Sequence, residues 1–421
     1  MARLPALRPS RGLPYPQVMF FRTLLPLCVL ASLAVAEPLT SESATRLALE
    51  KNPELAAARE LIAEAEARAS GLGRLPNPEL ETEVALGRQG RGRIEVGLSQ
   101  TFPRASRLRL ERRVADESML LARREVALAE LAIIARTRLA VLELAGTQAE
   151  LALAEKQAVL ARDLARTQAA QVRSGQLSAL DSAEAELMAR ETELAVALPR
   201  AAQAAAAIQL ATVLGREADA ELTVAVDLAL PPDEAAVPPP GLCADVALAE
   251  AQLTAADAEI ALARSQGRED YKLGVFAEGD QDRDDSGGRD QQAMLGVRFS
   301  IPLPVRNVAA PLIAEKQAAR RRLALEREAR VREAVNEVAA SATEVRARHV
   351  AARALAAELL PAARAHLAAT EAAYARGEID STPVFRARER LAEIERSDLA
   401  ARLAYHRAAV RRLSAACCIP L

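Results

Sequence analysis

The fold is decided by Arg93-Ile94-Glu95-Val96-Gly97-Leu98-Ser99-Gln100-Thr101-Phe102-Pro103, a stretch in which apolar and polar residues alternate. Ile94, Val96, Leu98 and Phe102 fall on one side of an extended chain, which predicts a strand with one apolar face. The preceding stretch alternates in the same way, and a short loop at 88–92 joins the two. We therefore expect a hairpin with strands at about 79–87 and 93–102.

A second hairpin is expected further along the chain, with strands at about 271–278 and 292–301. Apolar residues again alternate with polar or small ones, and an acidic loop joins the two strands. Each strand has about nine residues, which is enough to cross a bilayer when the strand is tilted. Soluble antiparallel sheets alternate in the same way, so the hairpins alone leave a soluble sheet open.

A very long helical stretch follows each hairpin. About 70 residues separate Pro103 from Gly175, and a similar number separate Pro304 from Gly377. A helix of that length measures roughly 100 Å. In the first stretch apolar residues recur every seven positions, which predicts a coiled-coil seam. The seam consists of Leu121, Leu128, Ala135, Leu142 and Ala149.

The chain is organised as an internal duplication. Each half runs as helix, strand pair, long helix, turn and helix, and we place the two repeats at 37–225 and 242–416. The segment between them, 226–241, is rich in proline and cannot form the interior of a helix. Residues 417–421 remain as a short tail.

The first 36 residues are typical of a secretory signal peptide. An arginine precedes a short apolar run that ends in Ala-Val-Ala, so cleavage is expected after Ala36. Position 37 is a glutamate rather than a cysteine, so no lipid anchor is expected. No later stretch has about 18 consecutive strongly apolar residues, so no transmembrane helix is expected either.

Composition and motifs argue against nucleic-acid binding and against catalysis. The formal net charge is −2, and aromatic residues make up only 2% of the chain. The sequence contains no phosphate-binding loop, no nucleophile elbow and no zinc-binding helix motif. We therefore expect no enzyme activity, no cofactor, no metal site and no nucleic-acid partner.

In a lipid bilayer, the two hairpins would have to pair with strands of further copies of the chain. Four strands are too few to close a barrel around a pore, and an open strand edge in lipid leaves unpaired backbone groups. If the strands lie in a membrane, several chains must share one barrel, and the polar faces line a wet lumen. The long helices carry charges along their length, so they must extend into the periplasm.

Several short motifs resemble the TolC family of outer-membrane efflux proteins, in order and spacing, over about 40–416. They include Asn52-Pro53-Glu54-Leu55, Gly97-Leu98-Ser99-Gln100-Thr101-Phe102-Pro103, Ser300-Ile301-Pro302-Leu303-Pro304 and Tyr374-Ala375-Arg376-Gly377. The resemblance implies a mainly α protein with a membrane β-barrel, in which a homotrimer forms a twelve-stranded barrel and long coiled coils form a periplasmic α-barrel.

The resemblance also implies a function and partners. The family acts as a passive channel in the outer membrane of Gram-negative bacteria, together with a periplasmic adaptor and an inner-membrane pump. We expect export of small solutes, with heavy-metal ions as one candidate cargo. The alternatives are a periplasmic coiled-coil adaptor and a structural coiled-coil protein. The duplication argues against the first, and the strand interruptions argue against the second.

The resemblance places the periplasmic tip at the turns around Gly175 and Gly377, with Asp181 and Asp380 beside them. These residues are expected to contact the adaptor, although both glycines also serve as helix caps. Asp181 lies where the family carries a gate carboxylate, and a solvated or capping role for it stays open. The second repeat departs from the pattern, and an ion pair between Asp181 and Arg386 is one candidate replacement for an acidic gate.

Overall fold

The structure is a computed structural model that describes 38–87, 92–175, 178–217, 222–231, 243–267, 270–283, 289–303 and 309–416. Met1–Glu37 and Pro38–Leu421 are separate units, and the description below concerns the second unit. The expected signal peptide, the tail and 232–241 of the linker lie outside the described residues. The repeat boundaries stay predictions.

Two short helices open the described chain. Helix α1 (Ser41–Lys51) begins with a capping box in which Thr40 and Ser43 bond to each other's backbone. Helix α2 (Pro53–Gly71) begins after Asn52, whose side chain accepts a hydrogen bond from the Leu55 backbone at 3.0 Å. Pro53 takes the first helical position, where its missing N–H costs nothing. Asn52 therefore caps the start of α2.

All four strands belong to one antiparallel sheet. The strands are β1 (Glu79–Leu86), β2 (Gly92–Phe102), β3 (Tyr271–Arg283) and β4 (Arg289–Ser300), in the spatial order β1-β2-β3-β4. The two expected hairpins are present. The pairing of β2 with β3, in which Leu98 lies opposite Val275, was not predicted, and it joins the two repeats into one sheet.

The long helix expected after the first hairpin is a single element. Helix α3 (Ala105–Arg173) has 69 residues, which corresponds to about 100 Å. The chain then returns through α4 (Ala179–Ala195) and α5 (Ala197–Val213), which are separated at Val196. Pro199 lies in the first turn of α5, where a proline is tolerated, and it marks the new helix start.

The long helix of the second repeat is interrupted, unlike α3. Helix α6 (Ala244–Gln266) precedes the second hairpin, and α7 (Ala309–Ala354) follows it. One π-helical turn, η2 (Leu355–Leu359), separates α7 from α8 (Leu360–Ala375). Pro361 is the second residue of α8, and its missing N–H removes a bond from the helical ladder. Helix α9 (Ser381–Ala415) completes the chain.

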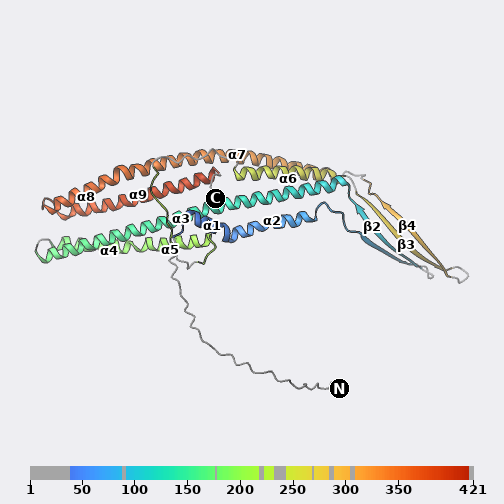
Figure 1. The fold of residues 1–421 in the computed structure, drawn as a ribbon, viewed down its shortest axis with the longest axis horizontal. Helices are drawn as coiled ribbons and strands as arrows, with labels where there is room; N and C mark the ends of the chain where they lie inside the picture. The colour runs from blue at the N-terminus through green and yellow to red at the C-terminus, as the bar shows by residue number, and fades with distance from the viewer. Residues whose placement is uncertain are drawn as a thin grey trace, which may run out of the picture. The chain divides into compact units, whose positions relative to one another are not determined.

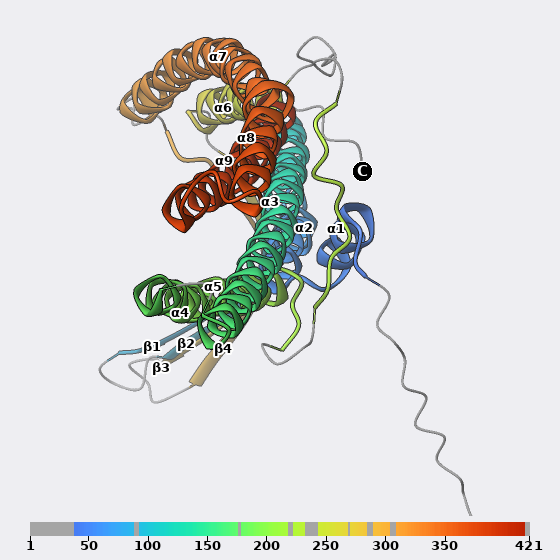
Figure 2. The ribbon, with the colours of Figure 1, turned by 90° about the vertical axis from the view of Figure 1, so that its left-hand side faces the viewer.

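Helix α3 is the central element of the second unit. It contacts α1, α2, α4, α5, α6 and α9. Figure 1 shows the sheet at one end of the helices and the α3–α4 and α8–α9 turns at the other end. Figure 2, which looks along the helices, shows α3 lying between the α8–α9 pair and the α4–α5 pair.

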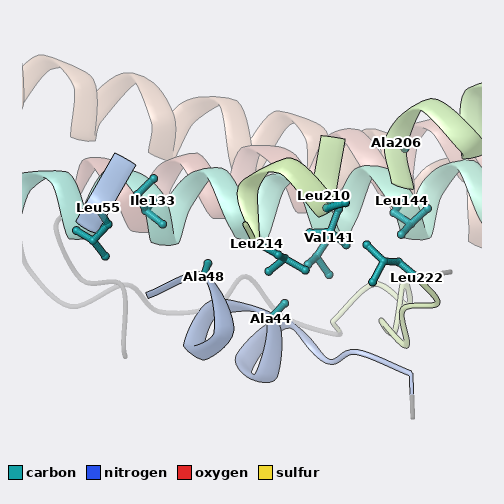
Figure 3. Packing of buried hydrophobic residues seen from close by; sticks show 11 residues of the cluster. Ala44, Ala48, Leu55, Ile133, Val141, Leu144, Ala206, Leu210, Leu214 and Leu222 are labelled. Carbon is teal, nitrogen blue, oxygen red and sulfur yellow. The ribbon is translucent and has the colours of Figure 1, made fainter. Parts of the chain in front are cut away.

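The main hydrophobic core lies where α1, α2 and α5 cover the middle of α3 (Figure 3). Ile133, Val141 and Leu144 of α3 meet Leu210 and Leu214 at the end of α5. The expected seam on α3 is only partly correct, because Leu142 alone among its five residues is buried. Helix α3 has neighbours on several sides, so its burial is spread over more than one row of residues.

One helical stretch among the described residues is long and apolar enough, by length and composition, to cross a membrane. It is Ala179–Val213, with a mean hydropathy of 1.3 in its best window and 22% of that window buried. The stretch contains charged residues such as Arg190 and Arg200, so it is not a run of consecutive apolar residues. The stretch lies along α3, and Arg162 and Glu193 form an ion pair between the two at 2.6 Å.

Candidate functional site

One face of the sheet exposes its large apolar side chains. Leu86 is 86% exposed and Leu295 is 84% exposed. The row continues on every strand. Its members are Leu80, Val84, Ile94, Val96, Leu98, Tyr271, Leu273, Val275, Val297 and Phe299. An apolar face of this extent is a contact surface for lipid or for another protein.

The other face of the sheet is polar, and its charges are bridged to one another. Carboxylates that would normally be solvated are covered, since Glu95 is only 5% exposed and Glu278 only 7%. Three cations bridge four carboxylates across the strands: Lys272 with Glu79 and Glu81 at 2.7 and 2.6 Å, Arg298 with Glu81 and Glu95 at 3.1 and 2.5 Å, and Arg93 with Glu278 at 2.5 Å. The sheet is thus apolar on one side and charged on the other, and Glu95 and Glu278 are buried on the charged side.

Both edges of this sheet are open. Among the described residues, β1 pairs only with β2, and β4 pairs only with β3. Each outer edge presents backbone N–H and C=O groups that need a partner strand or water. The edges bound an apolar face, so lipid could not satisfy them.

At the opposite end of the helices, the first turn follows α3. Gly175 has φ +75°, which only glycine adopts readily, and its N–H donates to the Val172 carbonyl at 3.0 Å. Ser178 then caps α4, with its hydroxyl accepting from the Leu180 backbone at 3.2 Å. Asp181 lies in the first turn of α4.

The second turn repeats this geometry between α8 and α9. Gly377 has φ +76°, and its N–H donates to the Tyr374 carbonyl at 2.9 Å. Glu378 accepts two hydrogen bonds from the Arg376 guanidinium, at 2.6 and 2.9 Å. These bonds hold the pKa of Glu378 below its usual value and raise the pKa of Arg376. Asp380 is the N-cap residue of α9, but its side chain makes no capping bond.

The two turns meet through a residue that sequence reasoning missed. The Ser381 hydroxyl donates to Asp181 Oδ1 at 3.3 Å, across 200 residues of sequence. Ser381 is buried, whereas Arg386 is exposed on α9. No ion pair joins Asp181 to Arg386 among the described residues of the chain. A contact between these residues of different copies stays a prediction.

A cavity of about 200 Å³ lies beside this contact, between α3, α8 and α9. Gln168 lines it and is almost fully buried, and its amide oxygen has no hydrogen-bond partner among the described atoms. Arg388 and Glu371 form an ion pair at 2.6 Å on the same wall. No sequence signal identifies this wall, since its residues come from three separate helices.

The described part of the chain offers no candidate metal site. No group of three or more histidine, cysteine, aspartate or glutamate side chains there is arranged to hold a metal ion. His349 is buried in α7, and its Nε2 lies 3.0 Å from the Pro231 carbonyl oxygen. That bond attaches the start of the linker to α7.

Comparison with solved structures finds channel proteins over most of the chain. The structure of CusC, whose study concerns transmembrane channel formation, aligns with a TM-score of 0.73 and 17% identity over 89% of this chain and 91% of that chain. The outer-membrane channel OprN aligns with a TM-score of 0.73 and 19% identity, over 89% of each chain. The open-state outer-membrane channel MtrE of Neisseria gonorrhoeae aligns with a TM-score of 0.71 and 17% identity, over 89% of this chain and 88% of that chain.

No protein-family model and no curated protein matches the sequence. The similarity to these channels therefore rests on the arrangement of the helices and strands. The sequence identities of 17–19% are low. The expectation of a mainly helical protein with long helices and a four-stranded sheet is confirmed. The chain has the fold of the TolC-family outer-membrane channels.

Proposed function

We propose that this chain is one subunit of a passive outer-membrane channel that exports small solutes and catalyses no reaction. The observation that carries the proposal is the four-stranded sheet, which has an exposed apolar face, a charged opposite face and two open edges. A sheet with this polarity suits lipid on one side and a water-filled lumen on the other.

Copies of the chain would close the sheet. An open edge in hydrocarbon costs several kcal/mol for each unsatisfied backbone group, so β1 of one copy pairs with β4 of the next. Three copies would give a twelve-stranded barrel, which is the assembly implied by the TolC family. The homotrimer belongs to this proposal, and the fold likeness to solved outer-membrane channels supports it.

An unpartnered stripe on α4 and α5 supports the same assembly. Leu180, Leu187 and Leu194 recur every seven residues, and each is more than half exposed. Leu198 continues the row on α5. Heptad spacing of this kind is typical of a helix that packs against another helix. In the trimer this stripe would contact a helix of the neighbouring copy and extend the helical barrel.

The two turns at Gly175 and Gly377 form the proposed periplasmic tip. Their matching geometry supports a shared role in contacting a periplasmic adaptor, with Asp181 and Asp380 beside them. Three copies of Asp181 around one axis would attract cations and repel one another, which suits a gate. Arg386 of a neighbouring copy is the proposed counter-charge.

Energy for export would come from an inner-membrane pump, as the resemblance to the TolC family implies. Heavy-metal ions are one candidate cargo. Transport assays in a deletion strain, across metals and drugs, would identify the cargo. After cleavage of the signal peptide, the protein is expected in the outer membrane of a Gram-negative cell, without a lipid anchor.

Cell fractionation tests the proposal. The chain should sediment with outer membranes and run on gels as an SDS-resistant oligomer that heating converts to a monomer. A chain recovered in the soluble periplasmic fraction as a monomer would overturn it. A soluble adaptor or structural coiled coil would give that second result.

A further inference from the structure

An aromatic row crosses the sheet at its helix end. The Phe102 and Tyr271 rings stack with centroids 5.6 Å apart, and Tyr271 and Phe299 follow at 6.4 Å. They lie on β2, β3 and β4 near the strand ends that continue into the helices. Aromatic rows of this kind lie where hydrocarbon meets the lipid headgroups. The row therefore marks one boundary of the apolar face.

Exposed arginines follow this boundary directly. Arg104 comes two residues after Phe102, and Arg109 lies on the first turns of α3. Arg74 lies in the connection from α2 to β1. All three are exposed, and none of them forms an ion pair with a described residue. Arg113, also exposed, lies one turn beyond Arg109 on the same face of α3.

Arg107, which lies close to these arginines in the sequence, has a structural role instead. Arg107 is half-buried and bonds to Asp270 at 2.5 Å and to Glu111 at 3.1 Å. These bonds tie α3 to the start of β3. Glu111 also accepts from the Gly73 backbone, so its charge is shared within the chain. The exposed carboxylate Asp116 is the nearest acid on the Arg109 face of the helix.

We propose that Arg74, Arg104 and Arg109 bind the phosphate groups of anionic phospholipids in the leaflet that borders the helices. The inference rests on the proposed function, because it requires the apolar face to lie in a bilayer. Guanidinium groups bind phosphate oxygens in a bidentate manner, and they lose less hydration than ammonium groups do.

The spacing fits a lipid surface better than one small anion. The headgroup layer of one leaflet is about 5–8 Å thick. Arg104 and Arg109 lie about 7–8 Å apart along the helix axis, so together they span that layer. Arg113 lies deeper in water and adds attraction within a Debye length of about 8–10 Å.

Equilibrium binding of phosphatidylglycerol in mixed detergent micelles tests the inference on the purified full-length oligomer. The variant carries Arg74→Gln, Arg104→Gln and Arg109→Gln. Each removed arginine should lower the affinity about fivefold, and all three together roughly a hundredfold. The matched control carries Arg173→Gln, Arg353→Gln and Arg396→Gln, which are exposed arginines far along the helices, and it should bind as the wild type does.

Two further binding measurements identify the ligand. Phosphatidylcholine should bind weakly to all forms, and inorganic phosphate should not displace phosphatidylglycerol. Equal binding by the wild type and the triple variant, or full displacement by inorganic phosphate, would overturn the inference. A wild type that forms the SDS-resistant oligomer without preferring phosphatidylglycerol contradicts this inference alone. A wild type that forms no oligomer contradicts the proposed function instead.

Discussion

The sheet and the two helix turns lie at opposite ends of the helices. They differ in how far the chain itself provides partners for their polar groups. In the sheet, Leu295 is 84% exposed while Glu95 is 5% exposed. At the turns, the glycine caps close the ends of α3 and α8, and Ser178 caps the start of α4, all from within the chain. The sheet is therefore incomplete as a single copy in water, whereas these three helix ends are satisfied within the chain.

This difference indicates which interactions come from outside the chain. The sheet needs lipid for its apolar face and further strands for its edges. The turns need neither, so a partner at the tip would bind a preformed surface. The two ends thus predict different responses to substitution.

The largest expected effect is at the apolar face of the sheet. Leu295→Lys places a charge where lipid is proposed and should destabilise the folded protein in a membrane by about 2–4 kcal/mol near the bilayer midplane. Loss of the SDS-resistant oligomer on gels is the expected readout. Met294→Lys is the matched control, because Met294 is adjacent but lies on the charged face opposite Glu278. Equal loss for both variants would contradict the assignment of the two faces.

The turns should respond equally to loss of their glycines. Gly175→Ala and Gly377→Ala each meet no neighbouring atom within 4 Å, but both keep a left-handed backbone. Each should cost about 1–2 kcal/mol, from backbone strain alone. Thermal unfolding of the oligomer in detergent measures this. A much larger cost at one position would show that its turn packs against a partner absent from the single chain.

Strands were predictable from sequence because alternation is local. The alternation around Val96 and Leu98 predicts the apolar face of the strand from only five residues, and Pro103 predicts where the strand ends. The pairing of Leu98 with Val275 was not predictable, because it joins segments about 180 residues apart and leaves no local pattern. The sequence thus predicted two hairpins but not one sheet.

Helix interruptions and the tip contact were harder to predict. Pro361 signals the π-helical turn before it, but a proline in the first turn of a helix is also ordinary. Asp181 was identified only by resemblance, and its bond to Ser381 depends on how two distant hairpins meet. An ion pair between Asp181 and Arg386 was one candidate from the sequence and stays a prediction for neighbouring copies, while within the chain the buried Ser381 donates to Asp181.

The contact between the turns should matter less for stability than for conduction. Asp181→Ala removes the acceptor of the Ser381 hydroxyl and should cost about 1 kcal/mol. Single-channel recording should also show altered cation conductance if Asp181 lines the gate. Asp380→Ala is the control, since its side chain makes no capping bond in the same region. Unchanged conductance in the Asp181 variant would remove this residue from the gate.

The smallest expected effect concerns the exposed Arg376–Glu378 pair. The pKa of Glu378 is lowered from its usual value of 4.5 by the Arg376 guanidinium. The pair's contribution to stability is therefore fully present above about pH 4.5 and is lost as the pH falls through the lower folded-state pKa. Glu378→Gln should flatten this part of the pH profile of thermal unfolding. An unchanged profile would show that solvent screens the pair completely.

Electron cryomicroscopy of the detergent-extracted protein tests the central claim most directly. The account predicts a three-fold assembly in which β1 of each copy is hydrogen-bonded to β4 of its neighbour and detergent surrounds the apolar face. A detergent-free, water-soluble monomer whose β1 and β4 edges remain unpaired would contradict it.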